Sequence, residues 1–348
     1  MPLIEFTNKG LYCRAGDFYI DPWKPVPKAI ITHAHSDHAR VGSEHYLCHH
    51  QTLPVLKLRL GADITADSVE WNQPITHNGV QISLHPAGHI IGSSQIRVEY
   101  KGEVWVVSGD YKTEDDGLSG VFEPVRCNTF ISESTFGLPI YTWKKQADIY
   151  ADIQNWIINN QAMGKTSVIT AYSLGKAQRV LQCVAAITDK IFVHGAVWNT
   201  HNALTDAGIQ LPAVKRVTPE LPKEAYKNAV IIAPPSADGT PWMKKFAPYS
   251  VGICSGWMQV RGNIRRRNAD AGFALSDHAD WPGLLQAVKA TGAEKVYVTH
   301  GFQSAFSRYL TENGIEAAEV KTEYGTEDDE KIPGTEEQPV TTTTENKG

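Results

Sequence analysis

The sequence predicts an α/β protein in which one domain is interrupted by a second, and three observations support this. Short β-type segments fill the first 135 residues, and each ends in polar or metal-binding residue types. Helical and strand patterns then alternate over 140–255, which is typical of a parallel sheet. After residue 270 the polar strand ends return. We therefore expect a first domain built from 1–138 and 257–322, an inserted domain at 139–256, and a disordered acidic tail at 323–348.

The individual elements follow from local patterns. Strands are expected where β-branched and aromatic residues are bounded by turn residues. Examples in the first part are 28–32, 80–86, 94–100, 103–110 and 128–134. Apolar residues at three- and four-residue spacing predict helices at 144–164 and 174–188. Further strands are expected at 166–170, 190–195, 228–235 and 250–256. The last expected elements are a helix at 281–291, a strand in EKVYVTHGF, and a helix near 303–313.

Composition limits the class of protein. The chain has 348 residues, of which 42% are hydrophobic and 20% are charged, as in an ordinary soluble protein. It contains no apolar run of about 18 residues, and its N-terminal stretch lacks the pattern of a secretory signal. The five cysteines are scattered and never form CxxC, which favours free thiols in a reducing cytoplasm and argues against cysteine-bound zinc. We expect a cytoplasmic protein without membrane association.

Charge is unevenly distributed. The net charge is −5, and residues 326–348 hold seven acids and two lysines, which also sum to −5, so the rest of the chain is near neutral. Within that neutral part, RGNIRRRNAD gathers four arginines: Arg261, Arg265, Arg266 and Arg267. A local basic patch fits an anionic ligand such as a phosphate backbone. A solvated surface loop is the alternative interpretation.

The densest chemistry lies in ITHAHSDHARVG at 31–42. His33 and His35 are two positions apart in an extended segment, so both imidazoles can face one ion. Asp37 and His38 follow on the turned backbone and can reach a second ion. Imidazole and carboxylate ligands suit zinc and its first-row neighbours. The spacing HxHxDH therefore predicts a metal site.

These residues resemble the signature of the metallo-β-lactamase superfamily, which implies an αββα sandwich with a two-metal site on one edge. Its other motifs match Asp21 in FYIDP, His89 in PAGHIIGS and Asp110 in VVSGDY. The resemblance implies that His33, His35 and His89 hold one ion, that Asp37 and His38 hold the second, and that Asp110 bridges them. It makes Asp21 a residue that orients a ligand by a hydrogen bond. Zn²⁺ is the expected metal, with Mn²⁺ as the alternative.

Three further stretches resemble motifs of the β-CASP nucleases, in which an α/β domain is inserted into the metallo-β-lactamase chain. They are FISESTFG with Glu133, FALSDHAD with His278, and VYVTHGF with His300. The resemblance implies that His278, oriented by Glu133, protonates the leaving oxygen after a metal-activated hydroxide attacks the phosphate, with Asp37 among the catalytic residues. His300 would complete the shell of the second metal. In AYSLGKAQR, Lys176 and Arg179 near a helix start suit a phosphate, or simple capping.

Residues 255–285, together with TAYSLGKAQRVL, resemble the bacterial ligase-associated DNA exonuclease family, over nearly all of 5–315. This implies a DNA exonuclease in DNA repair, functionally associated with an ATP-dependent DNA ligase and a helicase. Trp257 would stack on a base and the four arginines would pair with phosphates, unless Trp257 is core and the arginines are plain surface. Histidine at the position of His300 is usual in β-CASP enzymes that cut RNA, so RNA processing is the alternative function. An inactive nucleic-acid scaffold and a thioester or lactam hydrolase are further alternatives.

Overall fold

Two sheets face each other in the computed structural model, which describes residues 2–260 and 269–324. The first sheet has the strand order β1 (Glu5–Phe6), β2 (Leu11–Cys13), β3 (Phe18–Ile20), β4 (Lys28–Ile30), β5 (His45–His49) and β6 (Ala66–Val69). The second has the order β19 (Glu316–Glu319), β18 (Lys295–Gly301), β11 (Thr129–Ser134), β10 (Glu103–Val107), β9 (Ser94–Tyr100), β8 (Val80–Pro86) and β7 (Ile75–His77). Alternate apolar residues of both sheets, such as Ile20 and Ile82, are buried against each other.

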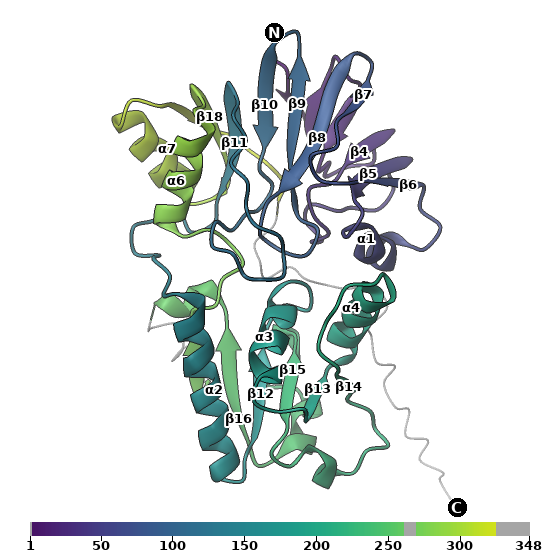
Figure 1. Cartoon of the computed structure of the whole chain (residues 1–348), viewed down its shortest axis with the longest axis vertical. Coiled ribbons are helices and arrows are strands. Elements are labelled where there is room, and N and C mark those ends of the chain that lie inside the picture. Colours follow the sequence, from purple (N-terminus) through teal and green to yellow (C-terminus); the bar gives the residue numbers. More distant parts are fainter. Residues whose placement is uncertain (1, 261–268, 325–348) are drawn as a thin grey trace, which may run out of the picture.

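Helices cover the outer face of each of these sheets. The side chains of α1 (Leu53–Leu60) pack with Tyr46 of the first sheet. The helices α6 (Trp281–Thr291) and α7 (Gln303–Glu312) cover the second sheet, with Leu284 and Phe306 in one cluster with Phe130. The layer order is therefore helix, sheet, sheet, helix, as the upper half of Figure 1 shows.

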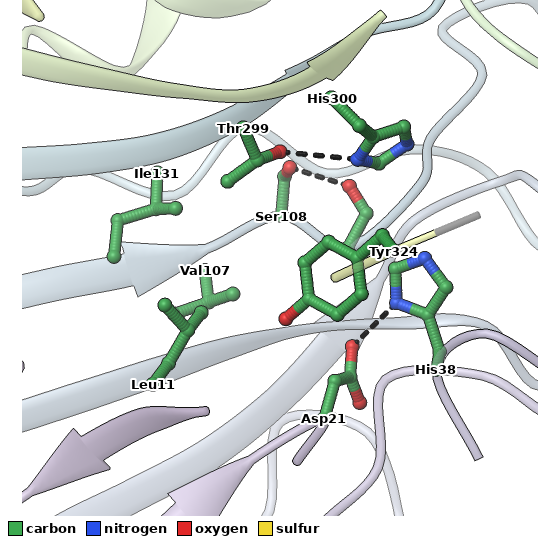
Figure 2. Close-up of a pocket in the computed structure, with 10 residues that line it drawn as sticks. Leu11, Asp21, His38, Val107, Ser108, Ile131, Thr299, His300 and Tyr324 are labelled. Atoms are coloured by element: carbon green, nitrogen blue, oxygen red, sulfur yellow. Dashed lines mark hydrogen bonds and ion pairs between the residues drawn. The ribbon is translucent and has the colours of Figure 1, made fainter. Parts of the chain in front are cut away.

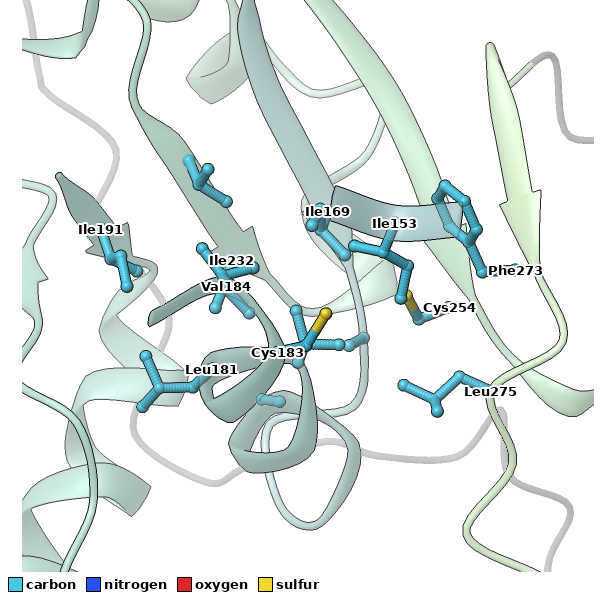
Figure 3. Packing of buried hydrophobic residues seen from close by; sticks show 14 of the residues in the cluster. Ile153, Ile169, Leu181, Cys183, Val184, Ile191, Ile232, Cys254, Phe273 and Leu275 are labelled. Carbon is cyan, nitrogen blue, oxygen red and sulfur yellow. The ribbon is translucent and has the colours of Figure 1, made fainter. Parts of the chain in front are cut away.

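A third sheet with its own helices forms the lower half of Figure 1. Its order is β14 (Lys215–Arg216), β13 (Ile191–Val193), β15 (Val230–Ala233), β12 (Thr166–Thr170), β16 (Tyr249–Cys254) and β17 (Ala271–Phe273), and every pairing is parallel. Ile153 of α2 (Gln146–Ala162) and Val184 of α3 (Lys176–Ala185) pack on this sheet beside Ile169 and Ile232 (Figure 3). The parallel sheet expected for the inserted segment is thus confirmed.

Several observed elements are not among those named from the sequence, including β5, β6 and α1 in the first part of the chain. Helix α4 (Gly195–Asp206) was not expected, because its first residues, GAVWNTHN, include weak helix formers. His194 stabilises its start by accepting a hydrogen bond from Ala196 N at 3.1 Å. In addition, β17 joins the third sheet, so the chain leaves that sheet after Phe273 rather than at residue 256.

Short 3₁₀ helices occupy connections around the third sheet, at Lys223–Tyr226, Pro235–Ala237, Pro241–Phe246 and Gly256–Gln259.

Within residues 2–260 and 269–324, no helix has the length and apolar character needed to cross a membrane.

The strand directions gather chemistry-bearing residues at one edge. Strands β3 and β4 are parallel, so Asp21 and the histidine loop follow at the same end of the first sheet. In the second sheet β10, β11 and β18 are parallel, and two antiparallel pairings give β8 the same direction. The carboxyl ends of parallel strands meet at one edge, which faces the inserted part of the chain (Figure 1). A small apolar cluster crosses this junction and consists of Ala34, Val55, Ile90, Ile91, Leu174 and Leu204.

Candidate metal centre

Asp110 lies at the middle of the predicted ligands. Its Oδ2 atom is 3.5 Å from His33 Nε2, 3.6 Å from His38 Nε2 and 3.7 Å from His89 Nε2. Its Oδ1 atom is 2.9 Å from His300 Nε2. Asp110 follows Gly109, whose φ of +56° is left-handed and whose missing side chain lets Thr32 approach. The close approach of the two sheets therefore requires glycine at this position.

Two groups of ligand atoms share Asp110. His33, His35, His89 and Asp110 offer atoms within 4.8 Å of one another, and so do His38, Asp110 and His300. Asp37 adjoins the second group, with Oδ2 at 3.6 Å from His38 Nε2. The structure thus brings all seven predicted metal ligands together, in two adjoining groups that share Asp110.

Asp21 orients two of the histidines. Its Oδ2 atom accepts hydrogen bonds from His38 Nδ1 at 2.7 Å (Figure 2) and from Thr32 Oγ1 at 2.5 Å. Thr32 Oγ1 in turn accepts from His33 Nδ1 at 3.0 Å. Asp21 itself has a φ of +41°, an uncommon conformation for a residue other than glycine, and such positions often accompany functional sites. Both imidazoles are therefore held with Nε2 toward Asp110.

Backbone carbonyls set the other two rings. The carbonyl of Asp277 accepts from His89 Nδ1 at 2.8 Å, and that of Leu174 accepts from His35 Nε2 at 3.3 Å. A carbonyl can only accept, so in each neutral ring the second nitrogen carries a lone pair. Those two nitrogens, His89 Nε2 and His35 Nδ1, face each other at 3.1 Å. Two facing lone pairs at this distance repel, and a cation between them removes the repulsion.

Electrostatics keep the first group neutral. Burial lowers the pKa of His33, His35 and His89, and neighbouring histidines lower it further. Neutral imidazole is the form that binds a metal.

The second group, around His38, has more carboxylate neighbours. Burial alone would lower the pKa of His38, but Asp37, Asp110 and Asp21 outweigh it and raise that pKa to about 10. The site therefore favours a positive charge at His38 Nε2, whether a proton or a metal ion.

A second buried pair lies beside the ligands. Both carboxylate oxygens of Glu133 are 2.9 Å from His278 Nδ1, and the His278 ring centroid is 4.6 Å from that of His89. Glu133 also accepts from Tyr111 N at 2.8 Å. The backbone of His278 is fixed by Trp143 Nε1, which donates to its carbonyl at 3.0 Å. This matches the predicted pairing of Glu133 with His278.

Lys176 and Arg179 require a correction. Both were expected to contact phosphates, but each is only 1% exposed and both point at Asp277. Arg179 Nη1 donates to Asp277 Oδ1 at 2.7 Å, and Lys176 Nζ is 3.4 Å from Asp277 Oδ2. The helix start that carries them enters the interior between the two halves of the chain, so they neutralise a buried carboxylate. Arg179 also contacts Asp116, at 3.6 Å.

Trp257 and the four arginines are the remaining predicted nucleic-acid contacts. Trp257 is half-buried, with its ring centroid 4.8 Å from Phe136 and 5.7 Å from Tyr141. It therefore belongs to an aromatic cluster, and Phe136 of that cluster lies 6.0 Å from the His278 ring. The four arginines at 261 and 265–267 lie outside the described residues.

Sequence reasoning missed Tyr324, which it had grouped with the tail. The Tyr324 ring stacks on His38 at 4.4 Å with an interplanar angle of 11°, and Figure 2 shows it beside Asp21 and Val107. It lines a small pocket together with His300 and Thr299. Arg40 holds the preceding residue by donating from Nη2 to the carbonyl of Glu323 at 2.6 Å. No local pattern in this polar stretch indicates such a contact.

Comparison with known proteins finds three informative relatives. "Probable DNA ligase" of Opitutus terrae is 30% identical over 318 residues, which are 90% of this chain and 30% of that protein. "Endoribonuclease ysh1" of Schizosaccharomyces pombe is 28% identical over 189 residues, 53% of this chain and 22% of that protein. "Cleavage and polyadenylation specificity factor subunit 3" of Dictyostelium discoideum is 25% identical over 119 residues, 33% of this chain and 15% of that protein. The chain thus spans less than a third of the length of each.

A solved structure shares the fold. A protein of unknown function from Enterococcus faecalis V583 superposes with a TM-score of 0.56 at 12% identity, covering 86% of this chain and 80% of that one. No family model matches the sequence. At 12% identity, this structural similarity supports a shared fold and nothing about function.

Proposed function

We propose that this chain is a two-metal-ion phosphodiesterase of the metallo-β-lactamase superfamily, in its β-CASP group, and that it acts as a DNA exonuclease. The similarity to ysh1 and to the cleavage factor subunit supports a metal-dependent nuclease of this group. The order of layers, with a separate parallel sheet inserted between β11 and α6, supports the metallo-β-lactamase sandwich with an inserted β-CASP domain.

The observation that carries the proposal is the pair of ring nitrogens of His35 and His89, which face each other beside Asp110. Their other nitrogens are committed to carbonyls, so a cation is the partner that this geometry fits. His33, His35 and His89 would hold one ion; Asp37, His38 and His300 would hold the second; Asp110 would contact both. Zn²⁺ suits these ligands first and Mn²⁺ second.

Bound ions would supply a Lewis acid for the phosphate oxygens and would lower the pKa of a water. The chain's own residues provide the proton. Glu133 accepts from His278 Nδ1 and fixes the ring. His278 would act as the imidazolium, in which Nε2 carries the second proton and gives it to the leaving oxygen while Nδ1 keeps its own. Asp21 and Thr32 keep the histidine loop from rotating away as charge develops. The proposed reaction requires residues from before and after the inserted sheet, because the histidine loop precedes that sheet in the sequence and His278 follows it.

The choice of DNA rests on sequence similarity. The relative that aligns with 90% of this chain is a probable DNA ligase, so a segment like this one occurs within a protein named for joining DNA. That supports a functional association with an ATP-dependent DNA ligase, and with a helicase as a further partner in DNA repair. The second candidate is RNA processing. His300 at the third motif and the names of the endoribonuclease relatives favour it.

Digestion of DNA and RNA oligonucleotides, labelled separately at each end and with or without a 5′-phosphate, tests substrate and direction together. We expect Zn²⁺- or Mn²⁺-dependent release of mononucleotides from DNA ends, while circular DNA resists. Intact single- and double-stranded DNA under these conditions would contradict the proposal. Cleavage of circular RNA with DNA spared would establish the second candidate instead.

Two variants show that the cleavage belongs to this site. Asp37→Ala should abolish activity, since it removes a carboxylate 3.6 Å from His38. Asp63→Ala, a change outside the site in a surface loop, should leave activity unchanged, so that the loss in Asp37→Ala excludes a contaminating nuclease. A chain that binds less than one ion and cleaves nothing would instead be a nucleic-acid scaffold.

A further inference from the structure

A second group of potential ligands lies at the far edge of the first sheet. His49 ends β5, and Glu70 directly follows the neighbouring parallel strand β6. His50 pairs with that strand through its backbone, its N atom donating to Val69 O at 3.2 Å. The two strands end together, so the three side chains meet. Their ligand atoms lie within 4.8 Å of one another.

His49 is the unusual member. Its residue is 1% exposed, and in the described part of the chain neither ring nitrogen has a hydrogen-bond partner. A neutral imidazole has one N–H donor and one acceptor, and leaving both buried without a partner is unfavourable. The ring cannot turn out to solvent easily, because it stacks on Trp71 at 4.0 Å with an interplanar angle of 3°. Trp71 is held in turn by Ser94, whose Oγ accepts from Trp71 Nε1 at 3.0 Å.

The partners of His49 are accessible. His50 Nδ1 lies 3.1 Å from Glu70 Oε2, and these side chains are 44% and 67% exposed. The ring centroids of His49 and His50 are 4.1 Å apart. One buried imidazole, one exposed imidazole and one exposed carboxylate thus lie together, and the last two are open to solvent. Two histidines and a glutamate form a zinc ligand set, with water in the fourth position.

We propose that His49, His50 and Glu70 bind a divalent first-row metal ion, Zn²⁺ above all, at a site separate from the candidate metal centre. The ion gives the buried His49 the partner that it lacks. It also joins β5 to β6 next to Thr52, which precedes α1 and whose Oγ1 donates to Gly92 O at 2.8 Å. Gly92 belongs to the loop that carries His89, so the ion stabilises the sheet edge behind that loop.

Metal analysis of the full chain tests this. Wild type, His50→Gln and Glu70→Gln are loaded with Zn²⁺, dialysed together and analysed for zinc per chain. We expect each variant to retain one ion fewer than wild type. His45→Gln is the matched control, because His45 lies on the same strand and pairs with Asp67 at 3.0 Å, and these side chains are 38% and 75% exposed. It should retain the wild-type number. Equal zinc in wild type, His50→Gln and Glu70→Gln would overturn the proposal.

A second measurement separates this site from the candidate metal centre. In Asp110→Asn, which removes the shared carboxylate of that centre, Zn²⁺ should still raise the melting temperature in a saturable way. Adding Glu70→Gln to that chain should make the rise smaller, because one of the binding sites is lost. An equal rise in Asp110→Asn and in the double variant contradicts the assignment, whatever the nuclease assays give.

Discussion

Replacing Arg179 with methionine tests the revised role of this residue. Arg179 Nη1 contacts Asp277 Oδ1 at 2.7 Å, Nη2 donates to Gln146 Oε1 at 2.6 Å, and Nε lies 3.6 Å from Asp116 Oδ2. All of the charged partners are buried. Methionine keeps much of the volume but leaves two carboxylates in the interior without the guanidinium. We therefore expect a loss of stability and of catalysis, with DNA affinity retained.

The magnitude follows from the burial. Breaking a buried ion pair by removing one partner costs about 3–5 kcal/mol. Lys176 remains 3.4 Å from Asp277 and still neutralises part of its charge, so the expected loss is about 3 kcal/mol, the low end of that range. Against a typical stability of about 5–15 kcal/mol, urea unfolding measures such a change easily. Asp277 supplies the carbonyl that holds His89 and precedes His278, so a shift of about 1 Å there should lower kcat about 100-fold.

The controls make the test sharp. Arg179→Lys keeps the charge without the forked geometry, and should give an intermediate loss. Arg308→Met removes an exposed arginine that pairs with Glu312 at 2.8 Å, and should change neither stability nor kcat. If Arg179→Met unfolds like wild type but binds DNA more weakly, with a shallower salt dependence, the phosphate contact expected from sequence is right and the buried role is wrong.

Three further predictions concern the metals, Tyr324 and the thiols. Removing the ions with a chelator should abolish cleavage, and Zn²⁺ should restore it. Relative to protein at a free metal concentration about 100 times Kd, the free energy of unfolding should fall by about 2.7 kcal/mol per ion. If metal analysis shows that the ions are gone and the melting temperature is unchanged, the prediction is refuted. Tyr324→Ala should lose metal more readily on dilution than Tyr309→Ala, because Tyr324 stacks on His38 whereas Tyr309 is exposed and contacts Trp281. Equal retention would contradict that role. Burial raises the pKa of Cys48, Cys127 and Cys183 from 9.0 to about 12. The unfolded thiols therefore ionise first, and each should lower stability by about 1.4 kcal/mol per pH unit above about pH 9. Urea unfolding near pH 8 and near pH 10 measures this, and Cys48→Ala should reduce the slope; an unchanged slope would refute the assignment.

Much of the candidate site was predictable because its ligands follow strand ends. His33, His35 and Asp37 lie within one short loop, and their spacing alone indicates a metal site. Asp110 and Glu133 follow apolar segments whose pattern predicts strands, and parallel strands place such ends at one edge. The inserted parallel sheet was predictable for the same reason, since its strands are continuous buried runs.

Other features depend on contacts between distant segments. A lysine and an arginine at a helix start look like phosphate ligands until the fold places Asp277, about a hundred positions away, between them. The orientation of His35 and His89 depends on the backbone carbonyls of Leu174 and Asp277. Because every residue has a backbone carbonyl, the residue types in a sequence pattern do not indicate these contacts.

By itself, the sequence determined which side chains can bind metal and in what order they occur along the chain, because residue type and short spacing are local properties. Only the tertiary structure decided which nitrogen of each ring faces Asp110, that Arg179 is interior, and that Tyr324 covers His38. Those outcomes depend on packing and burial, and the free energy of a buried charge or ring depends on everything around it. The residue types in HAHSDH therefore indicate metal binding, while the orientation of these side chains depends on the residues that the fold brings beside them.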